Sequence, residues 1–144
     1  MTTTILVPID LGIDRDTDPG LARARDVARL SDSRIALLYV VPDVPLGYVS
    51  PELRPATLAR VRYEAFERLN AIGAELGVPY EAIVEEGSPA RSILEVARRL
   101  PAHLIVMASH NPAFSDYLLG SVAARVVRYA QCSVFVARQG PAEE

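Results

Sequence analysis

The chain has 144 residues, of which half are hydrophobic and 23% are charged, with a formal net charge of −3. This length and composition predict a single domain over residues 1–144, with enough apolar residues to build its own core. The negative net charge, together with the absence of a cluster of basic residues in the sequence, argues against a nucleic-acid partner. No apolar run is long enough to span a membrane, MTTTILVPID lacks the pattern of a signal peptide, and the lone Cys132 suits a reducing compartment. We therefore expect a cytoplasmic protein without a membrane partner.

Short apolar runs and a helical pattern alternate in the first part of the chain. Residues 4–9 and 34–41 are continuous apolar runs, which is typical of strands buried on both faces of a sheet. Pro8 has no backbone N–H, so it should lie near the end of its strand. Asp18-Pro19 predicts a helix start, and that helix continues to about residue 31. Its expected apolar face comprises Leu21, Ala24, Val27, Ala28 and Leu30.

The rest of the chain repeats this alternation. A proline-rich surface excursion leads to an amphipathic helix from Pro55 to Gly77. Residues 80–86 alternate more than the other strands and suit a sheet edge, and Ser88-Pro89 predicts the start of a third helix. Two further strands are expected at 103–108 and 133–137. They are separated by a helix over about 118–130, whose expected buried face comprises Val122, Val126, Val127 and Ala130.

Strict alternation of strand and helix predicts the fold class. It indicates an α/β, doubly wound parallel sheet of the Rossmann-like type, with helices on both faces. Sheets of this kind bind ligands outside the carboxyl ends of their strands. Asp10, Val40-Val41 and Ala108-Ser109 all follow or end apolar strands. We therefore expect them in three loops of one crevice.

A strand-to-helix stretch, residues 107–129, is the best candidate for a phosphate site. The first N–H groups of a helix have no partner within the helix, and the helix dipole attracts anions to them. We expect phosphate oxygens on the N–H groups of Gly120 and Ser121, with polar contacts from the Ser-His-Asn segment at 109–111. Plain helix capping by Gly-Ser is the alternative. Neither of the common glycine-rich phosphate motifs occurs in the chain.

Several segments resemble the universal stress protein family over essentially the whole chain: ILVPID, ALLYVV, EEGSPARSILEVA, and LIVMASHNP followed by DYLLGSVAARVVRYAQCSVFVAR. Many nucleotide-binding members carry a G-x-x-G segment, a loop and then G-[ST]. Here Ala108 and Asn111 stand at the two glycines, and Gly120-Ser121 matches the last pair. The loop at 112–119 is one residue shorter than the common pattern. With the A-S-H-x-P form, this resembles the F/G-type nucleotide-binding branch of the family.

The resemblance implies a five-stranded parallel sheet in the order 3-2-1-4-5 and a homodimer. It also implies ATP, accompanied by Mg²⁺, across the carboxyl ends of the first, second and fourth strands. Pro8 and Ile9 would form a floor, Asp10 would lie by the nucleoside, and the Val40 backbone would read the adenine edge. The full set of residues implied to bind the nucleotide is Pro8, Ile9, Asp10, Val40, Ala108, Ser109, His110, Asn111, Gly120 and Ser121.

Three functions remain open from the sequence. The first is an ATP-binding regulatory module in a stress response, and the second is a nucleotide-free family member that binds an unidentified protein partner. The third is a slow ATPase, which we disfavour because no P-loop lysine, metal–carboxylate cluster or partnered base is evident. We expect no enzyme activity and no protein-bound metal, so His110 is assigned to phosphate hydrogen bonding. Asp10 either caps its own loop or contacts the nucleoside.

The last strand, SVFVAR, carries a separate expectation about assembly. As the end of a parallel sheet it would expose unpaired backbone groups together with apolar side chains. Such an edge favours pairing with a second copy of itself. We therefore expect a homodimer through the C-terminal strand.

Overall fold

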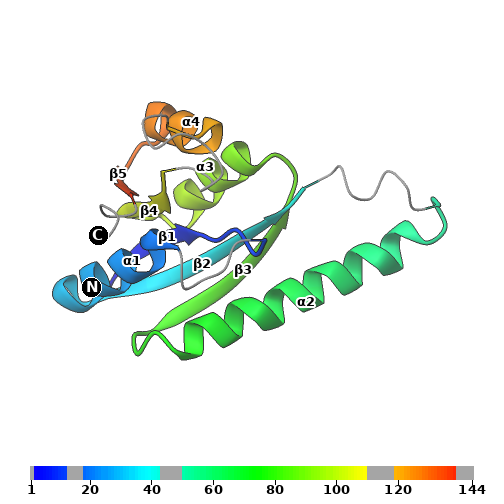
Figure 1. Ribbon diagram of the computed structural model, residues 1–144, viewed down its shortest axis with the longest axis horizontal. Helices are drawn as coiled ribbons and strands as arrows, with labels where there is room; N and C mark the ends of the chain where they lie inside the picture. Colours follow the sequence, from blue (N-terminus) through cyan, green and yellow to red (C-terminus); the bar gives the residue numbers. More distant parts are fainter. Residues whose placement is uncertain (1, 13–17, 43–49, 110–118, 139–144) are drawn as a thin grey trace, which may run out of the picture.

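The computed structural model describes residues 2–12, 18–42, 50–109 and 119–138. Its strands form one five-stranded parallel sheet in the order β3-β2-β1-β4-β5 (Figure 1). This confirms the doubly wound fold that the sequence predicts. In chain order the elements are β1 (Thr3–Pro8), α1 (Pro19–Ser31), β2 (Ser33–Val41), α2 (Arg54–Ala74), β3 (Tyr80–Glu86), α3 (Pro89–Arg99), β4 (Leu104–Ala108), α4 (Ser121–Tyr129) and β5 (Ser133–Ala137).

The core consists of two apolar layers, one on each face of the sheet. Because side chains alternate along a strand, Ile5 and Val7 of β1 enter one layer while Leu6 enters the other. Helices α1 and α2 cover the first layer, and α3 and α4 cover the second (Figure 1). The two helices before β3 thus lie on one face and the two after it on the other, which is the arrangement that right-handed crossovers impose when the strand order reverses.

Two residues that we expected on buried helix faces are exposed instead. Leu30 is 89% exposed, because the buried residues of α1 are Gly20, Ala24 and Ala28. Leu30 follows Ala28 by two positions and therefore points to the opposite side of the helix. Val127 is 46% exposed on α4, next in sequence to the fully buried Val126. Apolar spacing alone does not show which face of a helix packs against the sheet, and both residues lie off that face.

The helix boundaries also differ in places from those expected. Helix α4 begins at Ser121 rather than near residue 118, with Gly120 as its N-cap. Helix α2 ends at Ala74, before the predicted stop at Gly77, although Gly77 does have a positive φ of 70°. The predicted starts of α1 at Asp18-Pro19 and of α3 at Ser88-Pro89 are confirmed.

Candidate functional site

The strand order reverses between β1 and β4, and the two strands part at their carboxyl ends. Pairing of β1 with β4 ends at Leu6 opposite Ile105, whereas pairing of β1 with β2 continues to Pro8 opposite Leu38. The Ile9 N–H donates to the Leu38 C=O at 2.8 Å, so the backbone of Pro8, one residue earlier, faces β4. Pro8 has no N–H to offer on that side. Proline thus occurs where the ladder between β1 and β4 has already ended. Ligands of doubly wound sheets bind at this switch point, and we call the region at these strand ends the crevice.

Val40, near the end of β2, turns its backbone toward this crevice. The Leu38 C=O faces β1, and alternation along the strand gives Val40 the same orientation. Beyond Ile9 the chain of β1 leaves the ladder. Among the described residues, neither the N–H nor the C=O of Val40 has a hydrogen-bond partner. One donor and one acceptor therefore lie side by side, aimed beyond the end of β1.

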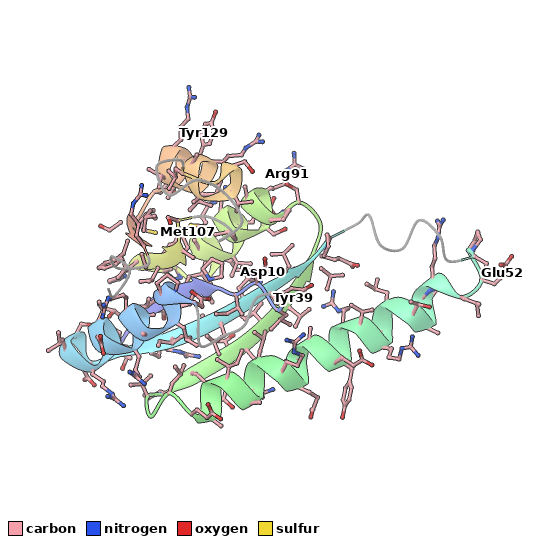
Figure 2. The ribbon with its side chains drawn as sticks, viewed as in Figure 1. Asp10, Tyr39, Glu52, Arg91, Met107 and Tyr129 are labelled. Carbon is pink, nitrogen blue, oxygen red and sulfur yellow. The ribbon has the colours of Figure 1, made fainter. Side chains whose placement is uncertain are left out.

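Two carboxylates flank the end of β1. Asp10 is exposed, and its Oδ1 accepts the Gly12 N–H at 2.9 Å, so it caps its own loop (Figure 2). Asp18 is the N-cap of α1, and its Oδ1 accepts the Gly20 N–H at 2.8 Å. Burial is the main cause that raises the pKa of Asp18, and the charge of Asp10 raises it further, against hydrogen bonds from the Gly20 and Leu21 backbone. The carboxylates of Asp10 and Asp18 therefore lie close enough for their charges to interact.

Ser109 joins three elements at the carboxyl end of β4. It is 3% exposed, and its N–H donates to the Ala137 C=O of β5 at 2.9 Å. Its own C=O accepts the Gly120 N–H at 2.8 Å. This corrects one expectation, since the Gly120 N–H is already used inside the protein and is not a donor for phosphate.

Helix α4 nevertheless begins with unused donors. Its N-cap, Gly120, has no side chain to cap it, and the first N–H bonded within the helix is that of Ala124, to the Gly120 C=O at 2.8 Å. The N–H groups of Ser121, Val122 and Ala123 precede it and have no acceptor among the described residues. Gly120 has φ −60° and ψ 155°, which any residue adopts, so the backbone does not require glycine there.

Gly20 holds the start of α1 directly against the end of β4. A Cβ built on Gly20 would lie 3.3 Å from the Ala108 N and 3.3 Å from the Met107 C. A side chain would therefore push the helix away from the strand. Because of this contact, the carboxylate of Asp18 lies beside the carboxyl end of β4 as well as that of β1.

The structure thus brings together most of the residues predicted from the sequence. Those it places at the carboxyl ends of β1, β2 and β4 or at the start of α4 are Pro8, Ile9, Asp10, Val40, Ala108, Ser109, Gly120 and Ser121. His110 and Asn111 lie outside the described residues. Asp18 and Gly20 were missed, although Asp18-Pro19 had been recognised as a helix start. Both residues start the helix that follows the first strand, and this position alone could have indicated that they lie at the carboxyl ends of the strands.

Within the described ranges, no helix is long and apolar enough to cross a membrane. The same ranges hold no group of three or more His, Cys, Asp or Glu residues arranged to hold a metal ion. Cys132 is half-buried just before β5, and burial raises the pKa of its thiol. A raised pKa disfavours the reactive thiolate, and Cys132 packs against the core layer beneath α3 and α4.

Comparison with known proteins agrees with the fold and the sequence landmarks. The model of the universal stress protein family matches residues 1–138. The chain belongs to the universal stress protein family. It is 31% identical to universal stress protein G of Escherichia coli O157:H7, with 96% of this chain and 100% of that protein covered. It is 32% identical to universal stress protein MJ0531 of Methanocaldococcus jannaschii, with 94% and 81% covered.

Several solved structures share the fold of this universal stress protein. The hypothetical protein MJ0577 superposes with a TM-score of 0.79 at 23% identity, covering 99% of each chain. A universal stress protein from Archaeoglobus fulgidus, solved in complex with dAMP, gives 0.66 at 23% identity over 94% and 97%. A family member from Arabidopsis thaliana with AMP bound gives 0.61 at 22% identity over 96% and 92%. Another universal stress protein was solved in complex with cAMP, with a TM-score of 0.66 at 22% identity over 94% and 95%.

Proposed function

We propose that this universal stress protein binds ATP, or a closely related adenine nucleotide, as a regulatory module in a stress response. The observation that carries the proposal is the Val40 backbone, whose N–H and C=O face the crevice and have no partner among the described residues. The edge of adenine offers an acceptor nitrogen next to a donor amino group, which matches one N–H and one C=O. Guanine offers the reverse arrangement on that edge. Relatives solved with AMP, dAMP or cAMP support an adenine nucleotide at this fold.

The start of α4 would hold the phosphates. The N–H groups of Ser121, Val122 and Ala123 have no acceptor in the part of the chain that the structure describes, and the positive end of the helix dipole lies with them. Ser121 is exposed, so its hydroxyl is available to the same ligand. Mg²⁺ would accompany the phosphates as their counter-ion. His110 and Asn111 remain proposed contacts in the connection that precedes α4.

We infer that the nucleotide is held rather than turned over. Transfer or hydrolysis of a phosphoryl group is catalysed by precise charge placement, commonly with a lysine on the phosphates and a residue that orients water. All positively charged side chains of this sequence are arginines, so no lysine is available. Asp10 is engaged by Gly12 and Asp18 by Gly20, so neither is poised as a base. Little or no hydrolysis is therefore expected.

Calorimetry with ATP and Mg²⁺ on matched variants tests the site. Ser121→Pro removes one N–H but keeps the helix start, because Gly120 already has the extended conformation that a residue before proline adopts. Ser121→Ala removes only the hydroxyl and is its control. Loss of a charge-assisted hydrogen bond costs about 1.5–3 kcal/mol, so Ser121→Pro should bind ATP about tenfold or more weakly. Gly120→Val should abolish binding while leaving the fold intact, because its side chain would occupy phosphate space.

Two further measurements complete this test. The Val40 amide signal should shift with ATP and not with GTP, and phosphate release should stay well below ~1 s⁻¹, the low end of ordinary enzyme rates. Faster release that persists through repurification would make the protein an ATPase. A wild-type protein that gives no heat and no thermal shift at millimolar ATP would refute the nucleotide site. The nucleotide-free, partner-binding function would then take its place.

A further inference from the structure

The sheet has a concave feature at its β3 edge. A hollow of about 490 Å³ is lined by the consecutive β3 residues Glu81–Val84, by Tyr63 and Phe66 of α2, and by Arg99 and Leu100 at the end of α3. Side chains of consecutive strand residues point to opposite faces of a sheet. Four in a row can line one hollow only if it runs along the edge of the strand. Helices from both faces border it, so it lies where a further strand would extend the sheet.

The backbone of β3 is open along this hollow. The Ile35 N–H donates to the Pro79 C=O at 2.9 Å, and the Gly87 N–H donates to the Val41 C=O at 3.0 Å. Odd-numbered residues of β3 therefore face β2, and even-numbered residues turn their N–H and C=O outward. Within the part of the chain that the structure describes, the outward N–H groups of Ala82, Val84 and Glu86 have no partner. β3 is an edge strand in Figure 1, alongside α2.

One arginine occupies a single position on this edge. The Arg62 side chain donates to the Val84 C=O at 3.2 Å and lies 3.7 Å from the Glu86 carboxylate. The Arg62 side chain is 41% exposed, so it can move aside without unpacking the core. It satisfies a carbonyl in the free protein and leaves the neighbouring donors open. An N–H group of an added strand would replace it.

The charges beside the edge are already paired with one another. Glu81 pairs with Arg34 and Glu85 pairs with Arg99, each at 2.6 Å, while Glu86 pairs with Arg62. The edge therefore offers no net charge for a charged partner to neutralise. What remains for a partner to contact are the outward backbone groups of β3 and the aromatic rings of Tyr63 and Phe66. These two side chains are 64% and 44% exposed.

We propose that the open edge of β3 docks an extended, uncharged segment of a partner protein as an additional strand. The segment hydrogen-bonds the even-numbered residues of β3 and places apolar side chains, at alternate positions, against Tyr63 and Phe66. Backbone pairing supplies affinity, and the aromatic pair selects the side chains. This docking surface lies on the side of β3 that faces away from β2, so its backbone groups are different from those proposed for the nucleotide.

Amide hydrogen exchange with a defined probe tests this proposal on the full-length protein. The probe is a peptide of alternating threonine and valine, as long as β3, acetylated and amidated, and N-methylated on alternate residues to prevent fibrils. At millimolar peptide, exchange of the Ala82, Val84 and Glu86 amides should slow. The amides of Ile83 and Glu85, already bonded to β2, should not change. A fully N-methylated peptide keeps the side chains, loses the donors and should have no effect.

Matched variants separate the backbone from the aromatic contribution. Ala82→Pro removes an outward N–H without removing a bond to β2, and Tyr63→Ser removes one aromatic ring. Each variant should bind the peptide roughly fivefold or more weakly. Tyr129→Ser, on exposed α4, should leave affinity unchanged. Unaltered exchange at the outward amides, or equal action of the fully methylated peptide, refutes the proposal. If the outward amides become protected from exchange as the protein concentration rises, in the absence of peptide, the proposal is refuted and a second copy of the chain pairs at this edge.

Discussion

At the scale of single residues, Asp18 is the most informative side chain of the crevice. Its pKa is raised above the ordinary value of 3.8, chiefly by burial and further by Asp10. Just above pH 3.8 the folded protein therefore holds a proton that the unfolded chain has lost. The free energy of unfolding must fall as pH rises through this window and stay lower above it. Burial of this carboxyl group therefore costs stability at pH values above that window.

Replacement of this carboxylate should change the pH dependence in a defined direction. Asp18→Asn keeps an oxygen for the Gly20 N–H and cannot ionise, so its stability relative to wild type should increase from about pH 4 upward and then level off. Urea unfolding followed by circular dichroism at a series of pH values measures this difference. Asp26→Asn, on the exposed side of α1, is the control for loss of one charge. A difference between Asp18→Asn and wild type that does not vary with pH would contradict the assignment.

At the scale of elements, α2 packs tightly against the start of β3 at Gly73. Gly73 of α2 is buried, and a Cβ on it would collide with the ring of Tyr80 at the start of β3. The Tyr80 hydroxyl donates to the Asn70 side-chain oxygen at 3.0 Å, which fixes the ring in place. Glycine is therefore required inside this helix for packing, despite its poor helix propensity.

Gly73→Ala should destabilise the protein even though alanine favours helix. Overpacking costs about 1–3 kcal/mol, and Tyr80 presents a rigid ring, whereas the propensity gain is roughly 1 kcal/mol. Chemical unfolding of the single variants and of Gly73→Ala/Tyr80→Leu gives the coupling between the two sites. The double variant should lose less stability than the two single losses combined, because leucine leaves room for the methyl group. Higher stability of Gly73→Ala alone would show that the contact is not tight.

At the scale of the whole molecule, β5 is the second open edge and the expected dimer contact. The Ser109 N–H donates to the Ala137 C=O, so Val134 and Val136 turn their backbone outward. Phe135, Val127 and Tyr129 are 39%, 46% and 57% exposed on β5 and α4. Unpaired strand groups beside exposed apolar side chains favour antiparallel pairing of two copies.

Light scattering after size exclusion should therefore give a dimer at tens of micromolar, roughly the range in which a modest interface associates. Val136→Pro removes an outward N–H without removing a bond to β4, and it should shift the protein to monomer. Ala82→Pro on the opposite edge is the matched control and should stay dimeric. A wild-type monomer at this concentration would contradict pairing through β5.

The sequence was sufficient for the fold and for most residues at the crevice, because both depend on local patterns. Apolar strand runs and helix starts such as Asp18-Pro19 identify the elements, and strand ends identify the crevice. The use of the Gly120 N–H could not be predicted, because its acceptor is a backbone carbonyl at Ser109, brought close only by folding. Backbone groups carry no sequence signal. The same holds for the backbone of Val40, which has no partner among the described residues because β1 leaves the ladder before reaching it.

Ser109 also links the crevice, which is the proposed nucleotide site, to the predicted dimer edge. One peptide unit on either side of this residue connects the start of α4 with the last residue of β5, through bonds of 2.8 and 2.9 Å. If the protein binds a nucleotide at the start of α4 and dimerises through β5, both events depend on the position of the Ser109 backbone. Thermodynamic reciprocity then applies: a nucleotide that strengthens pairing must itself bind more tightly to the pair, by the same factor. The dimer dissociation constant would then depend on the concentration of ATP.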